Sequence, residues 1–202
     1  MIPDLDHVAN AVARLRLRVS ADPRRRGPVP LGGYFAETAL DHVELPALTR
    51  GAVTEYLRRE GVPADDLGDP ADVLAGFIFA AGRVGWAFVS MDDPLPRRRF
   101  TAAHELGHFV LHRATMGRFR ADTDATLREA DDDVADRMER EANCFAAELL
   151  MPADVCRARA VEVRDKHGCC PRGVLVYRLS SELLVSREAL RYRLQTLGVG
   201  DE

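Results

Sequence analysis

The sequence Thr101-Ala-Ala-His104-Glu105-Leu-Gly-His108 places two histidines four residues apart, with a glutamate directly after the first. In an α-helix, side chains four residues apart lie on the same face, one turn apart, so both imidazoles can reach a single cation. Imidazole is a favoured ligand of zinc, and a glutamate beside the ion can take a proton from the water that the ion acidifies. The stretch therefore predicts a helix with His104 and His108 as metal ligands and Glu105 as the catalytic base.

A short pattern of this kind also arises by chance on the solvated face of a helix. The flanking sequence favours a buried helix instead, because it is rich in apolar residues: Phe100, Leu106, Phe109, Val110 and Leu111. A buried neutral imidazole needs partners for both ring nitrogens, and a metal on one with a hydrogen-bond acceptor on the other meets that need. His112, one turn after His108, is interpreted as a histidine that packs beside the ligands or supports them, rather than as a donor in the cleft.

A third ligand is expected, because a catalytic zinc commonly has three protein ligands and one open position. The candidate segment is helical in propensity and ends at a proline: Glu139-Arg-Glu-Ala-Asn-Cys-Phe-Ala-Ala-Glu-Leu-Leu-Met-Pro152. On a helical projection Glu139 shares a face with Asn143 and with small residues, whereas Glu141 lies roughly 200° away. Small residues allow a close approach to the histidine helix, and Asn143 could accept a hydrogen bond from a ligand histidine. We therefore expect Glu139 to be the third ligand; the alternative is that both carboxylates are ordinary surface charges.

Two segments together, Arg98–His112 and Glu139–Pro152, resemble the ImmA/IrrE family of metallopeptidases. The resemblance runs from about residue 72 to the C-terminus. It implies a zinc-dependent endopeptidase with a gluzincin-like site. It assigns the metal ligands and the catalytic base to His104, His108, Glu139 and Glu105. Because both acidic positions before Ala-Asn are filled here, the family pattern leaves Glu141 as an alternative third ligand.

The resemblance also implies a substrate. Several members of the family cleave a helix-turn-helix repressor encoded beside them and so release genes for mobile-element transfer, phage induction or the DNA-damage response. We therefore expect the partner to be such a repressor, of the XRE type, and the role to be bacterial transcription regulation. Zinc is the expected metal, although manganese suits a similar set of nitrogen and oxygen ligands.

Composition indicates an ordinary cytoplasmic enzyme. The chain has 202 residues, of which 47% are hydrophobic and 30% are charged, enough to bury one sizeable core. No stretch approaches the roughly 18 apolar residues of a membrane span, and the N-terminus lacks the pattern of a signal peptide. The cysteines are few and unevenly spaced, so neither a disulfide framework nor a second metal site is expected from Cys144, Cys156, Cys169 and Cys170.

Charge argues against a dedicated nucleic-acid binder, since the formal net charge is −4. The stretch from Asp122 to Glu141 is the most acidic part, with nine acidic and three basic residues. It is predicted to form a polar rim of the cleft. Such a rim would attract a basic substrate segment, and DNA-binding repressors are basic.

The expected fold class is α+β: a mainly helical, zincin-like core with a small sheet beside the histidine helix and a short C-terminal helical subdomain. The apolar runs Val73–Ala80 and Val84–Ser90 are predicted to form a β-hairpin. An edge strand at a protease cleft can bind an extended peptide by main-chain pairing, which gives the hairpin a possible substrate role. The alternative is a sheet that merely covers the helix.

Three regions are predicted along the chain. Residues 1–65 form a helical segment, docked on the core by default; residues 66–165 form the metallopeptidase core; residues 166–202 form a helix-turn-helix-like pair. In the last region we expect helices over 173–184 and 186–197, with Ser186 as N-cap and Gly198 as the stop. An arginine excess there, including Arg193, keeps open a different function: a DNA-binding regulator whose protease-like domain is a sensor.

Overall fold

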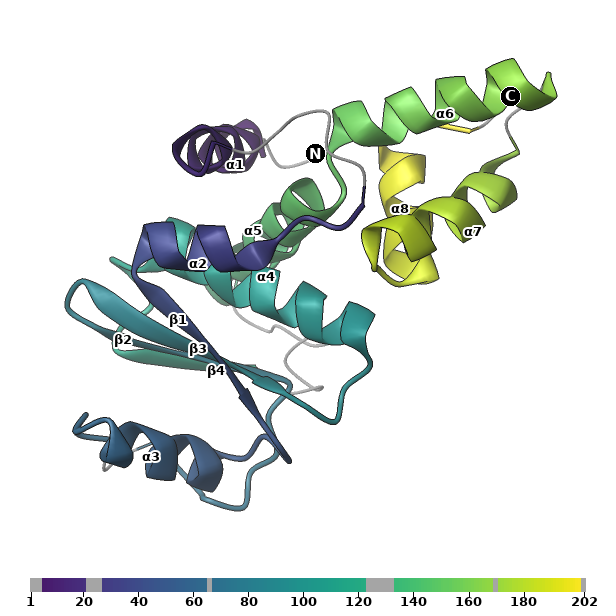
Figure 1. Ribbon diagram of the computed structural model, residues 1–202. Coiled ribbons are helices and arrows are strands. Elements are labelled where there is room, and N and C mark those ends of the chain that lie inside the picture. The colour runs from purple at the N-terminus through teal and green to yellow at the C-terminus, as the bar shows by residue number, and fades with distance from the viewer. Residues whose placement is uncertain (1–4, 21–26, 65–66, 123–132, 169–170, 201–202) are drawn as a thin grey trace.

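Within the described residues, a mixed sheet of four strands separates two hydrophobic cores. The computed structural model describes residues 5–20, 27–64, 67–122, 133–168 and 171–200 (Figure 1). The elements follow one another as α1 (Asp6–Arg18), α2 (Leu31–Thr38), β1 (Leu40–Leu45), α3 (Arg50–Arg59), β2 (Gly76–Ala81), β3 (Val84–Ser90), α4 (Leu95–His112), β4 (Phe119–Asp122), α5 (Asp133–Leu150), α6 (Ala153–His167), α7 (Arg172–Leu183) and α8 (Arg187–Thr196). The mainly helical α+β class expected from the sequence is confirmed.

The predicted hairpin is present as β2 and β3, although β2 begins at Gly76 rather than at Val73. Its place in the sheet differs from the expectation. The strand order is β1-β3-β2-β4, with β1 parallel to β3 and the other neighbours antiparallel. Both hairpin strands are therefore paired on both sides, and the expectation that the hairpin offers a free edge to a peptide is wrong. The edge strands are β1 and β4, which the sequence analysis did not predict.

The hairpin strands are apolar along their length because both faces of the sheet are covered. Side chains alternate between the faces of a strand, so Phe77 and Phe79 pack in one core with Leu57 of α3. Ile78, between them, packs in the other core with Leu106 of α4. Figure 1 shows α3 on one side of the sheet and α2 and α4 on the other. A sheet buried on both faces reads in sequence as continuous apolar runs.

Helix α4 lies close against the sheet. Pro94 precedes its first turn and Pro96 lies within that turn, a favourable position because the first turn needs no backbone donor there. Close packing depends on Gly85 of β3, where an added Cβ would lie 2.7 Å from Phe109 Cε2 and 2.9 Å from the carbonyl oxygen of Phe79. The glycine therefore makes room for an aromatic ring of α4 above the strand.

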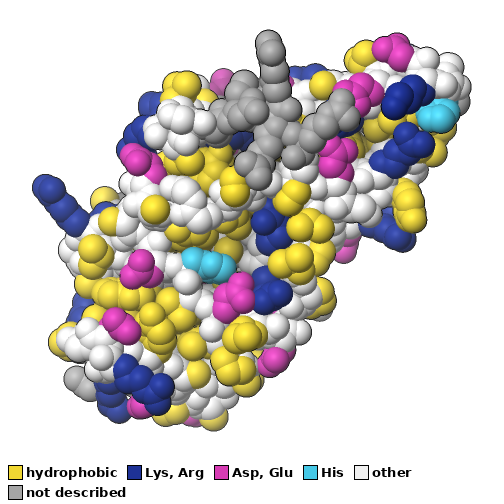
Figure 2. All heavy atoms as spheres, in the orientation of Figure 1, with side chains coloured by type: hydrophobic (Ala, Val, Ile, Leu, Met, Phe, Trp, Pro, Cys, Tyr) yellow, Lys and Arg dark blue, Asp and Glu magenta, His cyan; other side chains and the backbone are white. Residues whose placement is uncertain are grey.

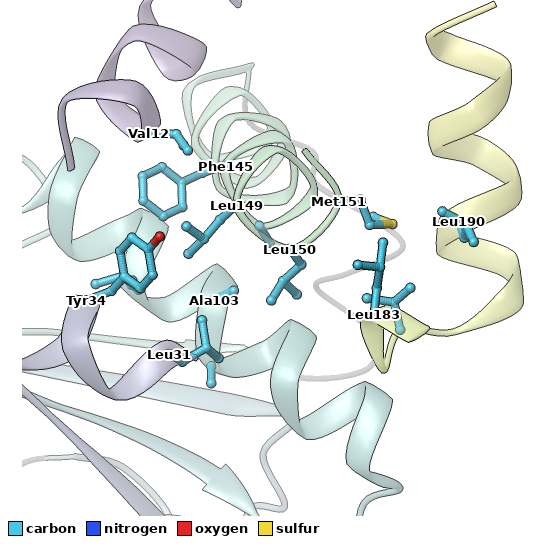
Figure 3. Packing of buried hydrophobic residues seen from close by; sticks show 14 of the residues in the cluster. Val12, Leu31, Tyr34, Ala103, Phe145, Leu149, Leu150, Met151, Leu183 and Leu190 are labelled. Carbon is cyan, nitrogen blue, oxygen red and sulfur yellow. The ribbon is translucent and has the colours of Figure 1, made fainter. Parts of the chain in front are cut away.

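The larger core lies between α4, α5 and the helices around them. Figure 3 shows α5 at its centre, with Phe145, Leu149 and Leu150 directed toward residues from α1, α2 and α4. As expected, the N-terminal helix docks on this core, where Val12 of α1 is buried. No helix in the described part of the chain is long and apolar enough to cross a lipid bilayer.

The C-terminal pair of helices forms as predicted. Ser186 Oγ accepts a hydrogen bond from the Ala189 amide at 3.1 Å, and Gly198 adopts a positive φ of 61° after α8. Arg193 differs from the expectation, because it is buried. Its Nε donates to the Met151 carbonyl at 3.1 Å and its Nη2 pairs with Glu148 at 2.7 Å, so it ties α8 to the end of α5.

The division into residues 1–65, 66–165 and 166–202 stays a prediction. Strand β1, from the first of these regions, pairs with β3 along its full length. The N-terminal region thus supplies one strand of the sheet that supports α4.

Replacement of Gly85 tests the contact between the sheet and α4. Gly85→Ala is expected to lower the free energy of unfolding by about 1–3 kcal/mol, because the new methyl group meets backbone as well as the Phe109 ring. Gly32→Ala is the control: Gly32 lies in α2 with no other atom near its Cβ position, and alanine favours the helix by up to about 1 kcal/mol. Denaturant unfolding measures both. Equal stability of Gly85→Ala and the wild type would contradict the tight contact.

Candidate metal centre

Three buried side chains from two helices converge on one point. His104 and His108 of α4 direct their Nε2 atoms toward each other at 3.0 Å. Glu139 of α5 places its carboxylate oxygens 3.3 Å from His104 Nε2 and 3.2 Å from His108 Nε2. These are the three residues that the sequence analysis assigned as metal ligands, and the structure brings them together.

The spacing of these atoms suits a small divalent cation. Zinc bound tetrahedrally at 2.0–2.1 Å holds its ligand atoms about 3.3 Å from one another. The three separations in the cluster are 3.0, 3.2 and 3.3 Å. One ligand atom from each side chain lies within 4.8 Å of the others, and all three residues are buried. The donor set of two imidazoles and a carboxylate therefore fits zinc in chemistry and in size.

Glu139 is held as a carboxylate. Burial alone would raise its pKa, but the close approach of His104 and His108 holds the pKa well below its usual value. Arg120 adds a further partner: its Nε donates to Glu139 Oε1 at 2.9 Å, and its Nη2 contacts the same oxygen. Arg120 was not predicted from the sequence, because the four-residue strand β4 that carries it has no recognisable pattern of its own.

Asn143 supports the first histidine, as predicted. Its Oδ1 lies 3.0 Å from His104 Nδ1. An amide oxygen can only accept, so Nδ1 carries the hydrogen and donates it, which leaves the lone pair of Nε2 directed into the cluster. The contact with Asn143 thus holds His104 in the tautomer that can bind a metal through Nε2.

Glu141 is neither a member of the cluster nor a surface charge. Its Oε2 lies 2.8 Å from His112 Nε2, and its Oε1 accepts from Arg137 Nε at 2.7 Å. Burial would raise its pKa, but hydrogen bonds from Arg137 and His112 lower it to about 2. His112 in turn lies beside His108, with their Nδ1 atoms 3.1 Å apart. The structure therefore favours Glu139 over Glu141 as the third ligand and places His112 as a support of the cluster.

Glu105, which follows His104 directly in α4, is fully buried. Its carboxylate lies against β2 at Gly76, where any Cβ atom would overlap Glu105 Oε1 and approach Thr101 Cγ2 to 2.8 Å. A glycine is thus required at this point of the strand for the carboxylate to occupy its place. The sheet forms the wall behind the predicted base.

Other candidate groups lie outside the cluster. Burial raises the pKa of Cys156 to about 11 and also raises the pKa of Cys144, so neither thiol is activated as a nucleophile. His167 ends α6 and contacts Arg178. The Gly-Cys-Cys-Pro turn at Cys169 and Cys170 and most of the predicted acidic rim, residues 123–132, lie outside the described residues.

A His-Glu-x-x-His helix, packed between a small sheet and a helix that supplies a glutamate, defines a metallopeptidase. Comparison with protein families agrees: residues 87–195 match the family Peptidase_M78, described as the IrrE N-terminal-like domain. The chain belongs to this family, which confirms the resemblance to ImmA/IrrE metallopeptidases. No curated protein matches the sequence. Peptidases of this family are metal-dependent, and the buried cluster could bind the ion.

The assignment of Glu139 as third ligand stays a prediction, which metal titration tests. Glu139→Ala is expected to weaken zinc binding by more than about 100-fold, since it removes a ligand and not merely a supporting contact. The control is Glu162→Ala, which removes a carboxylate from an ion pair with Arg159 outside the cluster. Competition with a chelating dye measures the dissociation constants. Unchanged affinity in Glu139→Ala would reject the assignment.

Proposed function

We propose that the protein is a zinc-dependent endopeptidase that cleaves a helix-turn-helix repressor of the XRE type and thereby relieves repression. The observation that carries the proposal is the buried cluster of His104, His108 and Glu139 with Glu105 beside it. Membership of the peptidase family supports the hydrolytic class. The proposed setting is the bacterial cytoplasm, where repressors act, in a stress response or in the control of a mobile element or phage.

Each residue of the site has its own role in the proposed peptide hydrolysis. When bound, zinc would supply Lewis acidity, which lowers the pKa of the attacking water toward about 7 and polarises the peptide carbonyl. Glu105 accepts the proton of that water and passes it to the amine that leaves. His104, His108 and Glu139 would hold the ion, and Arg120 keeps Glu139 in place. The C–N bond breaks, and the two products are a carboxylate and an amine.

The edge of the sheet offers a place for the substrate chain. Strand β4 pairs with β2 on one side, and no strand among the described residues pairs with its other side. Arg120 of β4 contacts Glu139, so this strand lies close to the metal cluster. An extended peptide could add to β4 by main-chain hydrogen bonds and so cross the site.

The acidic residues between positions 122 and 141 give partial support to a basic substrate. Residues 122–141 are strongly acidic in sequence, which would attract the basic segment of a repressor. Two of these acids, Glu139 and Glu141, are buried and paired, so they do not belong to an exposed rim. The attraction would come from the remaining acidic residues.

The second candidate function is DNA binding by α7 and α8. The observation that favours it is a shallow pocket at which Arg172, Arg187 and Arg191 gather around Tyr177. Two observations weaken it: Arg193 is buried in a structural ion pair, and basic and acidic side chains are interspersed on the face drawn in Figure 2. Duplex binding with a steep salt dependence would support this function.

Incubation with the repressor encoded nearest to the gene tests the proposed function. The zinc-loaded wild type is expected to give two fragments by intact mass, and Glu105→Gln none, although the variant still binds zinc. Removal of zinc by a chelator should stop cleavage, and added zinc should restore it. Identical fragments from wild type and Glu105→Gln would indicate a contaminating protease. Absence of cleavage by a fully zinc-loaded wild type would reject this repressor as the substrate.

Substitution of Gly76 separates metal binding from catalysis. Gly76→Ala is expected to displace the Glu105 carboxylate, because a methyl group would occupy its position against β2. Zinc affinity should stay within a few-fold of the wild type, while the cleavage rate should fall roughly 100-fold or more, since general acid–base catalysis contributes about 10²–10⁴. Parallel zinc titration and fragment assays measure the two effects. Full activity in Gly76→Ala would show that Glu105 is not confined by β2.

A further inference from the structure

A chain of hydrogen bonds runs outward from the metal cluster along one face of α4. His104, His108 and His112 follow one another at intervals of four residues, and the third imidazole does not reach the cluster. His108 Nδ1 lies 3.1 Å from His112 Nδ1, and His112 Nε2 lies 2.8 Å from Glu141 Oε2. His112 and Glu141 are both buried, at 5% and 7% exposure. The contacts are therefore shielded from water, which strengthens them.

The hydrogens of this chain can be placed by elimination. A neutral imidazole carries one hydrogen, on either of its two nitrogens. For His108 to offer the lone pair of Nε2 to a metal, its Nδ1 must carry the hydrogen and donate it to His112 Nδ1. His112 then carries its own hydrogen on Nε2 and donates it to Glu141. The Glu141 carboxylate can accept it at Oε2, because its other oxygen, Oε1, is paired with the Arg137 guanidinium at 2.7 Å.

The opposite arrangement prevents metal binding at one end and is unfavourable at the other. If His112 donated from Nδ1 to His108, the hydrogen of His108 would sit on Nε2 and point into the cluster. A bare His112 Nε2 would then face the ionised Glu141 oxygen at 2.8 Å, with two acceptors opposed. With a cation in the cluster, the tautomer of His108 that carries its hydrogen on Nδ1 gives both of its nitrogens a partner, and it is the tautomer that can bind metal.

We propose that Glu141 and His112 form a relay that positions His108 and strengthens it as a metal ligand. Partners of this kind fix the orientation of a ligand imidazole and raise its basicity. The inference rests on the proposed function, since it concerns the same metal site. Neither residue touches the ion or the substrate, so both are positioning residues.

The two ligand histidines are supported differently. His104 Nδ1 meets the neutral amide of Asn143 at 3.0 Å, whereas His108 reaches an ionised carboxylate through a second imidazole. A negative charge at the end of the chain favours positive charge on His108 more than an amide does. Loss of the relay is therefore expected to act on His108 and to leave the contact between His104 and Asn143 in place.

The carboxylate at the end of the relay is fixed by two further residues. Glu141 Oε1 accepts from Arg137 Nε at 2.7 Å and lies 3.3 Å from His7 Nε2. Arg137 is on the same helix, one turn earlier, and His7 comes from α1. The relay thus ends in a cluster of charges near the surface and begins at the metal ligand.

Zinc affinity of relay variants tests the proposal. Glu141→Gln keeps an acceptor for His112 but removes the charge, whereas Glu141→Leu removes both. We expect zinc affinity to fall roughly 10- to 100-fold in Glu141→Leu and less in Glu141→Gln. The matched control is Glu182→Gln, which neutralises a carboxylate paired with Arg159 at 2.9 Å outside the site. Its zinc affinity should equal that of the wild type.

A second measurement separates a positioning role from a merely structural one. In the zinc-loaded protein, NMR of the imidazole nitrogens should show a hydrogen on His108 Nδ1, and its resonance should shift in both Glu141→Gln and His112→Gln. The His104 Nδ1 resonance should move much less. Thermal unfolding with chelator present reports any loss of stability that is independent of metal, and Glu141→Gln provides a mild variant if Glu141→Leu fails to fold.

The outcomes distinguish the relay from the proposed function. Tight zinc binding by the wild type, with weakened binding and a shifted His108 signal in the variants, supports the relay. Wild-type affinity in Glu141→Gln, Glu141→Leu and His112→Gln would overturn the relay and leave the metal site intact. Lack of zinc binding by the wild type would overturn both.

Discussion

The packing of α4 against α5 is the constraint on which the rest of the site depends. Two imidazoles and a carboxylate can lie about 3 Å apart in a buried place only if the helices approach closely, and Gly107 allows this where its Cβ would lie 3.1 Å from Phe145. A buried carboxylate is costly unless it is paired. Glu139 meets that condition with His104, His108 and Arg120. The negative charge of Glu139, which needs these partners when it is buried, is also what suits the cluster to a cation.

The sheet fixes α4 from the other side. Glycines lie where the helix crosses the strands, Gly76 beneath the Glu105 carboxylate and Gly85 beneath the Phe109 ring. The predicted base and the predicted ligands therefore have separate supports: β2 confines Glu105, whereas α5 contacts the histidines. Two further elements support the cluster. Arg120 of β4 contacts Glu139, and His7 of α1 contacts Glu141. Elements that are distant in the sequence thus contribute to one site.

The parts of the structure that sequence could predict are those with local periodicity. The four-residue spacing of the histidines and the helical angle between Glu139 and Glu141 are properties of a single helix, and both led to the observed cluster. Strands β1 and β4 were missed because they are short and form by pairing with residues far along the chain. The error about the hairpin follows from the same cause, since its edges are covered by those two strands. Arg120 and the link from His112 to Glu141 were missed because each depends on tertiary contacts between separate elements.

The match to the family begins at residue 87, within β3, whereas the structural support of the site begins much earlier. A fragment limited to residues 87–195 would lack β2, and with it the wall behind Glu105 and the one described partner of β4. It would also lack α1, whose His7 contacts Glu141. The residues that match the family and the residues that support the site therefore have different boundaries in this protein. The first half of the chain, which carries no recognisable motif, supplies two strands and a helix that support the site in the second half.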